Sequence, residues 1–210
     1  MSKYRTKDED LQRIGTSIAN LESNPTLAAK LQGFGFTNES LAEGKLLFAT
    51  ATQKSQKQKM EEGEQHSATE RCNELFGLAD VRFKVIYKIS RVAIKEKGLQ
   101  DQLGVVSLEK STFDGWAQSR LDFYTNALSI PVVMERLGKY NIKAEDLTAA
   151  KKLVEDAIAA NQVQLKETGE ARMATSERND AFDTLKSWYD ELRQLAKLAL
   201  DKRECEILGL

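Results

Sequence analysis

The chain contains an internal repeat, and this repeat constrains the fold more than any other feature of the sequence. When the sequence is shifted by 106 positions, residues 1–104 align with residues 107–210 without a gap, and 22 of the 104 pairs are identical. Both prolines fall on one another, Pro25 on Pro131, and Gly63 falls on Gly169. A repeat of this kind predicts two copies of one supersecondary unit, so the two halves are expected to share helix boundaries and loop lengths.

The composition favours long helices and gives no sign of a membrane or nucleic-acid partner. Thirty per cent of the residues are charged and only two are proline, while 31 basic residues nearly balance 32 acidic ones. No apolar run is long enough to span a bilayer, and the first residues lack the apolar core of a signal peptide. We therefore expect a cytoplasmic protein, with Cys72 and Cys205 as reduced thiols.

Each half is predicted to begin with two short helices. In the first half an apolar stripe at helical spacing is followed by a break at Ser23–Pro25, and the second half breaks at Ser129–Pro131. Proline suits the first position of the second short helix, because its missing N–H has no partner there. That helix is expected to end at residues 33–36 or 139–142, whose glycines or asparagine can adopt positive φ.

A very long helix is predicted to complete each half, from Thr37 to about Lys97 and from Ala144 to about Arg203. Neither segment contains a proline, and a heptad register can be followed through both. The ends of this seam are apolar but its middle third is polar, which is unusual for a coiled coil.

Two structures fit the polar middle. In one, each long helix breaks into a hairpin at Gly63 or Gly169, and residues 67–70 form a capping box. In the other, each helix is continuous for about 60 residues, or roughly 90 Å. We favour continuity, because the register does not slip at either glycine and the capping box is absent from the second half.

The predicted fold is therefore all-α: a tandem-duplicated helical bundle with two halves related by a pseudo-two-fold axis. Its long helices would run antiparallel, the apolar start of one meeting the apolar end of the other in a dumbbell. Because neither half could bury its seam alone, residues 1–210 are expected to form one interdigitated domain made of the repeats 1–104 and 107–210.

The first candidate site lies in the central segment, where identities between the halves are most frequent. Glutamates recur there in both copies: Glu61, Glu64, Glu167 and Glu170. They could form a paired binding site, but we favour a structural explanation, in which small residues let the backbones approach at a helix crossing and buried glutamines fix the register. The only histidine is His66, so the Glu-x-x-His pairs of di-iron bundles are missing and no metal is predicted.

The second candidate site is a basic stretch in the first half, at residues 82–97. Glu96 is its only acidic residue, and its cations are Arg82, Lys84, Lys88, Arg91, Lys95 and Lys97. The matching segment of the second half mixes both signs of charge. A solvated helix face is the default interpretation, and the functional alternative is docking of an acidic partner or of a nucleic-acid backbone.

These observations predict a non-enzymatic structural or interaction protein, a helical spacer or adaptor with protein partners. No nucleophile–base pair and no phosphate-binding glycine motif is present, so no cofactor is expected. One alternative is a bundle that binds a small ligand or a metal in its polar central layer. A weaker alternative is nucleic-acid binding through the basic stretch.

Overall fold

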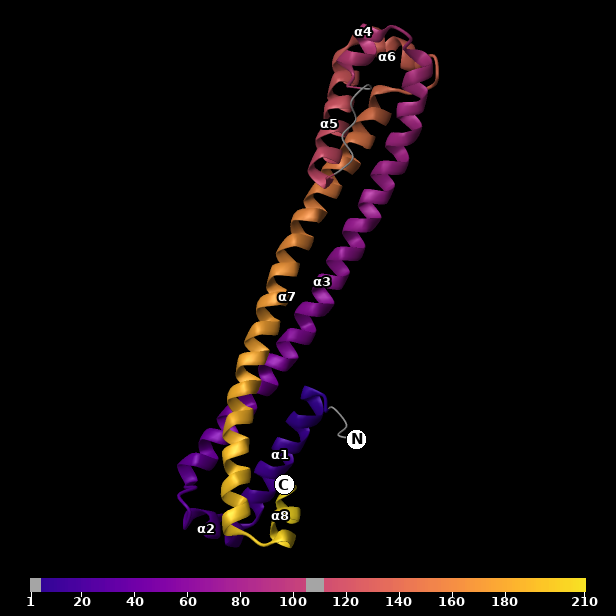
Figure 1. Cartoon of the computed structure of the whole chain (residues 1–210). Helices are drawn as coiled ribbons and strands as arrows, with labels where there is room; N and C mark the ends of the chain where they lie inside the picture. Colours follow the sequence, from indigo (N-terminus) through magenta and orange to yellow (C-terminus); the bar gives the residue numbers. More distant parts are fainter. Residues whose placement is uncertain (1–4, 105–111) are drawn as a thin grey trace. The chain divides into compact units, whose positions relative to one another are not determined.

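A computed structural model describes residues 5–104 and 112–210, and all regular secondary structure in these ranges is α-helical (Figure 1). This confirms the predicted all-α class. Within the described ranges, none of the helices combines the length and apolar character needed to cross a bilayer.

Eight helices are described, four in each half of the chain. Their bounds are α1 Lys7–Ser23, α2 Pro25–Gln32, α3 Asn38–Ala93, α4 Lys97–Gln102, α5 Phe113–Ser129, α6 Pro131–Gly138, α7 Ala144–Ala199 and α8 Lys202–Leu208.

The first three helices of each half have identical lengths. Helices α1 and α5 have 17 residues, α2 and α6 have 8, and α3 and α7 have 56. Pro25 and Pro131 each occupy the first position of their helix, as predicted. The loop after α2 contains Gly35 at φ 90°, and the loop after α6 contains Asn141 at φ 59°, so both loops use the positive-φ residues that the sequence indicated.

Helix α3 runs through Gly63 and α7 runs through Gly169 without a break. Neither glycine has a positive φ, whereas Gly35, Gly104 and Gly209 do. The hairpin alternative is therefore wrong. A glycine inside a helix costs only about 1 kcal/mol relative to alanine, which 56 residues of helix can absorb.

The ends of the long helices differ from the prediction. Helices α3 and α7 stop at Ala93 and Ala199, and a short helix follows each. The loop between α3 and α4 has three residues and the loop between α7 and α8 has two, so the offset falls from 106 to 105 at the N-cap residues Glu96 and Asp201. The expectation that every loop kept its length is wrong at this point. The short final helices were also missed.

The described structure divides into two compact units, and each takes segments from both halves of the sequence. The first unit comprises Met1–Gly63 and Gly169–Leu210, and the second comprises Glu64–Thr168. The first unit therefore contains α1, α2, α8 and one part of each long helix. The second contains α4, α5, α6 and the remaining parts.

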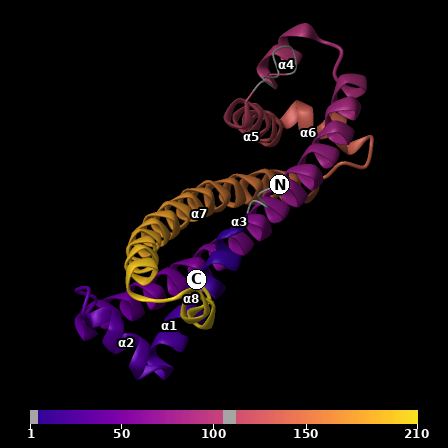
Figure 2. The same ribbon diagram turned by 60° about the horizontal axis from the view of Figure 1, so that its bottom comes forward.

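In the first unit, α8 lies against α1 (Figure 2), and both cover a core shared by the long helices. Trp188 of α7 packs with Phe36 at a ring-centroid distance of 6.0 Å, and its indole N–H donates to the Ser40 carbonyl at 3.0 Å. Farther along α3, Lys54 pairs with Glu177 of α7 at 2.8 Å. Because the partner in α7 moves from Trp188 back to Glu177 as α3 advances from Ser40 to Lys54, the two helices run antiparallel within this unit.

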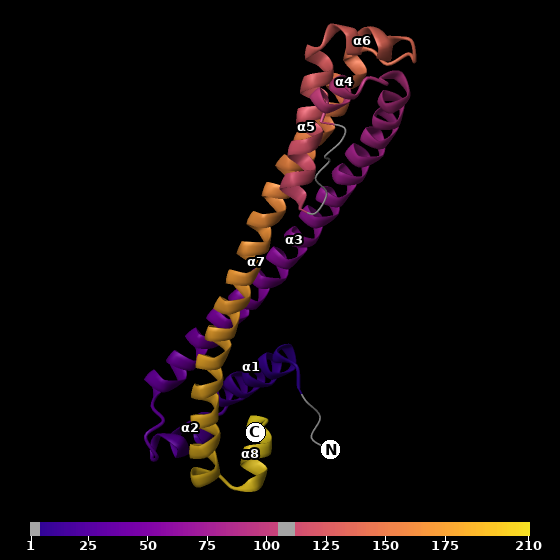
Figure 3. The same cartoon turned by 45° about the horizontal axis from the view of Figure 1, so that its top comes forward.

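In the second unit, α5 lies beside the first part of α7 (Figure 3), and the core is rich in aromatic residues. Phe83 of α3 contacts both Phe123 and Tyr124 of α5 edge to face, at ring-centroid distances of 5.3 and 6.0 Å. Such packing is favourable beyond the buried area itself. It fixes α5 against the part of α3 that carries the basic stretch.

Candidate functional site

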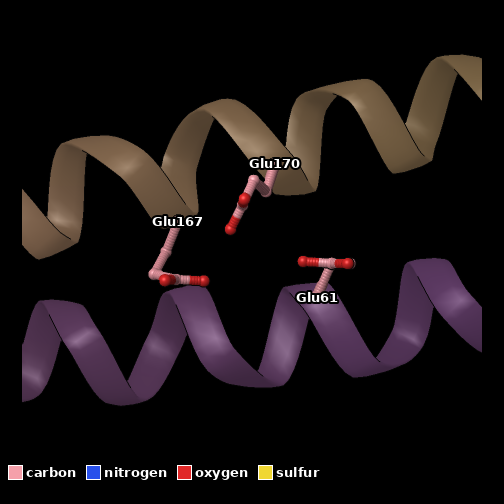
Figure 4. A group of neighbouring side chains, drawn as sticks. All are labelled: Glu61, Glu167 and Glu170. Carbon is pink, nitrogen blue, oxygen red and sulfur yellow. The ribbon is translucent and has the colours of Figure 1, made fainter.

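The central glutamates lie near the middles of α3 and α7. In the first unit, Glu61 and Glu170 point toward one another (Figure 4), and a carboxylate oxygen of one lies within 4.8 Å of an oxygen of the other. Glu64 and Glu167 belong to the second unit. Glu64 is exposed, whereas Glu167 is half-buried and pairs with Lys166 at 3.2 Å. Two facing carboxylates do not complete a metal site, so we assign no ligand to them.

The polar middle of the first unit is a hydrogen-bonded layer. Gln58 of α3 is only 6% exposed; its amide nitrogen donates to Glu62 at 2.9 Å and its amide oxygen accepts from Arg178 of α7 at 3.2 Å. Buried polar groups of this kind need partners, and Gln58 has them. In the first unit, these hydrogen bonds therefore give the polar seam residues a structural role.

The basic stretch lies wholly in the second unit, on the last turns of α3 and the loop that follows. Arg82 pairs with Asp146 of α7 at 2.9 Å, and Lys84 pairs with Asp80 at 2.6 Å. Lys88, Arg91 and Lys95 are exposed, and no carboxylate of the described residues lies within ion-pair distance of them. Three cations of the stretch are therefore available to a ligand.

The outward face of the same part of α3 is apolar. Leu78, Val81, Val85 and Val92, which we name the exposed stripe, are 51%, 65%, 48% and 53% exposed. They are spaced by three, four and seven residues, the interval of a heptad seam. The residues 106 positions later in the first unit are Thr184, Ser187, Glu191 and Leu198. Of the two segments compared, only that of the second unit has apolar residues at all four positions.

A groove borders the exposed stripe, between α3 and α5. It has a volume of about 970 Å³. We name it the cationic groove, because four cations and one carboxylate line it together with aromatic rings. The lining residues are Phe76, Asp80, Phe83, Lys84, Tyr87, Lys88, Arg91, Val92, Trp116 and Arg120.

Arg120 of α5 is the unexpected residue of the groove. It is 3% exposed, and its guanidinium lies 4.7 Å from the Phe83 ring centroid and 5.4 Å from that of Trp116. Burial lowers the pKa of Arg120, and the nearby charge of Asp80 opposes this shift. One feature of the sequence could have indicated that Arg120 is buried. It aligns with Ile14 of the first repeat, and isoleucine is typical of a core position.

Asp80 balances part of this charge. Burial would raise the pKa of its carboxyl group, but hydrogen bonds from Lys84 and from the Trp116 indole, at 3.3 Å, outweigh burial and leave the pKa below its usual value. Asp80 is therefore ionised at neutral pH. The groove retains an excess of positive charge.

Comparison with protein-family models, with curated proteins and with solved structures finds no match to this chain.

Proposed function

We propose that the protein is a non-enzymatic helical adaptor, and that its partner is an acidic amphipathic helix bound along the exposed stripe of the second unit. The observation that carries this proposal is the heptad spacing of Leu78, Val81, Val85 and Val92 on a solvent-facing helix surface. Single exposed apolar residues are ordinary, but a row of them on one face is typical of an interaction surface.

The spacing of the exposed stripe favours a helical partner. Side chains at alternating intervals of three and four residues fit between those of a facing helix, as knobs in holes. Leu78, Val81 and Val85 supply three consecutive knobs, and Val92 supplies a further one after Lys88. An extended peptide would not match this interval, because its side chains alternate with a period of two.

The flanking charges favour an acidic partner over a second copy of the chain. In the register of the exposed stripe, the positions that border a helical interface are occupied by Arg82, Lys84 and Arg91, with Lys88 in the seam itself. Two copies facing each other would bring these cations together, which is unfavourable. Glutamates on the partner would pair with Lys88 and Arg91, whereas Arg82 and Lys84 are already paired with Asp146 and Asp80.

The reactive side chains support a non-catalytic role. Burial raises the pKa of both the Cys72 and the Cys205 thiol, so both are protonated at neutral pH and are poor nucleophiles. His66 is exposed on α3. Such a set offers no activated nucleophile beside a base.

We also infer that the chain arose by tandem duplication, with its halves related by a pseudo-two-fold axis, and that it folds as one interdigitated domain. The equal lengths of α1 and α5, α2 and α6, and α3 and α7 support the duplication. The composition of each unit from both halves supports the interdigitation. As a spacer, the protein would join the binding surface of the second unit to the first unit through two continuous helices.

A pair of designed helical peptides tests the adaptor proposal. Both carry leucine at the seam positions; one has glutamate at the flanking positions and the other has lysine. We expect the acidic peptide to bind the full chain, and the double variant Val81→Asp/Val85→Asp to weaken this binding by about tenfold or more, because two anchors are lost and like charges are introduced. Fluorescence anisotropy of labelled peptides measures both affinities.

The matched control is Leu198→Asp, at the position that corresponds to Val92 in the first unit. Leu198 is 70% exposed, so the variant should fold normally and leave peptide binding unchanged. Equal binding of both peptides, or no binding of the acidic one, would contradict the proposal. A concentration-dependent dimer that Val81→Asp abolishes would identify a second copy as the occupant instead.

A further inference from the structure

The cationic groove has the size of a small-molecule site. Its volume of about 970 Å³ lies at the upper end of the range of roughly 300–1,000 Å³ in which proteins bind drug-sized ligands. It lies between α3 and α5 of the second unit, two helices that a shared aromatic core fixes against one another.

Aromatic rings give the groove an apolar lining. Phe83 and Trp116 are 2% and 4% exposed, so they close its floor, whereas half-buried Phe76 and Tyr87 keep ring surface accessible. The Phe76 and Trp116 ring centroids are 4.5 Å apart, and those of Phe83 and Tyr87 are 5.5 Å apart. These rings suit a flat apolar body, which can pack against them in offset or edge-to-face contacts.

The charged side chains that line the groove favour an anionic ligand. Asp80 is engaged by Lys84 and Trp116, while Lys88 and Arg91 stand exposed with no carboxylate of the described residues in reach. Arg91 lies with its guanidinium 6.0 Å from the Tyr87 ring centroid, beside the apolar lining. A guanidinium can hold a carboxylate through two parallel hydrogen bonds, and a lysine adds a point charge.

The first unit lacks part of this lining at the corresponding positions. In place of Lys84, Lys88 and Arg120 it has Asp190, Gln194 and Ile14, and in place of Trp116 it has Asp10. Helices α1 and α5 have the same length, so at these positions the difference lies in the side chains. The first unit keeps Phe182, Tyr189 and Lys197 in place of Phe76, Phe83 and Arg91. What belongs to the second unit alone is the combination of Trp116 and Arg120 with Lys84 and Lys88.

We propose that the cationic groove binds an aromatic carboxylate, with its ring system over Phe76 and Tyr87 and its carboxylate held by Lys88 and Arg91. A nucleic-acid strand fits less well. Bases need open aromatic faces on which to stack, and Phe83 and Trp116 are nearly wholly buried. The site shares Lys88, Arg91 and Val92 with the surface proposed for the helical partner, whereas Val81 and Val85 do not line the groove.

The two tryptophans provide a built-in reporter and control. The Trp116 indole N–H donates to Asp80 in the groove, while the Trp188 indole N–H donates to Ser40 in the first unit. In ¹⁵N-labelled full-length protein, 2-naphthoate should shift the Trp116 indole signal in a saturable way and leave that of Trp188 in place. The variant Trp188→Phe assigns the two signals.

Neutral and charge-reversed probes test the role of the cations. We expect 2-naphthamide to bind about tenfold more weakly than 2-naphthoate, because it forms no charge-assisted hydrogen bonds, and 2-naphthylmethylamine not to bind. The variant Lys88→Glu/Arg91→Glu should abolish naphthoate binding. Gln194→Glu/Lys197→Glu, at the corresponding positions of the first unit, should leave it unchanged, and so should Val81→Asp/Val85→Asp.

Three results would overturn the proposal. One is equal affinity for naphthoate and naphthamide, which would indicate apolar contact alone. Another is a response of Trp188 equal to that of Trp116. The third is a single-stranded DNA oligonucleotide that shifts Trp116 at lower concentration than naphthoate does, which would assign the groove to nucleic acid. All variants except Trp188→Phe change exposed residues, and thermal unfolding followed by circular dichroism confirms that each is folded.

Discussion

The close approach of α3 and α7 in the first unit depends on one missing side chain, at Gly44. A Cβ atom added there would lie 2.0 Å from the Trp188 ring, far inside van der Waals contact. Trp188 is itself buried, held by its hydrogen bond to Ser40, and cannot swing out of the way. Gly44 is therefore a packing glycine, in contrast to Gly63, whose surroundings are open.

Alanine substitution should separate these two roles. We expect Gly44→Ala to lower the free energy of unfolding by about 1–3 kcal/mol, the usual cost of overpacking a core. Gly63→Ala should raise it by up to about 1 kcal/mol, because alanine is the better helix former and nothing obstructs its methyl group. Urea unfolding of both variants measures the difference. A neutral Gly44→Ala, or a destabilising Gly63→Ala, would contradict this reading of the two glycines.

The free energy of local opening should vary along helix α3. Its seam residues between 55 and 69 are Ser, Gln, Glu, Gln and Thr, whereas Ala79, Phe83 and Ile86 farther along are at most 2% exposed. Few apolar contacts mean a low free energy of local opening. We expect amides of residues 55–69 to exchange with solvent sooner than those of residues 79–90. Hydrogen exchange followed by mass spectrometry measures both segments in one experiment. Equal protection of the two segments would contradict the expectation that the polar seam opens more easily.

The helices could be predicted from the sequence wherever a local signal existed. Pro25 and Pro131 mark helix starts through their fixed φ, and the unbroken heptad register predicts α3 and α7 as continuous helices. The end of α3 and the start of α4 were missed because the sequence carries no such signal there. The N-cap residue of α4 is Glu96, whose side chain makes no capping hydrogen bond. In the second half the capping box of Asp201 and Glu204 was available as a signal.

The candidate site was predictable only in part. The basic stretch is contiguous in sequence, so it could be found, although Arg82 and Lys84 prove to be engaged in ion pairs within the unit. The cationic groove could not be found, because Arg120 and Trp116 come from α5 and reach Phe83 and Phe76 of α3 only through tertiary packing. The periodicity of residues along one helix does not indicate which residues of another helix they contact.

At the scale of the whole molecule, the arrangement that matters most is the sharing of each unit between the two halves of the chain. The first unit needs residues 169–210 to complete the core around α1 and α2, and the second needs residues 64–104 to complete the core around α5. A half expressed alone would expose the apolar faces that these cores bury. The surfaces that we propose for ligands of the second unit depend on this sharing as well, because α3 and α5 come from different halves and pack in one core.

The measurement that tests this sharing most directly is the behaviour of residues 1–104 and 107–210 produced as separate chains. We expect neither to be a folded monomer: each should gain cooperative thermal unfolding only by association, with the other half or with a second copy of itself. An equimolar mixture should restore the helical circular dichroism of the full chain and sediment as a complex. A separate half that sediments as a monomer and unfolds cooperatively would contradict the account.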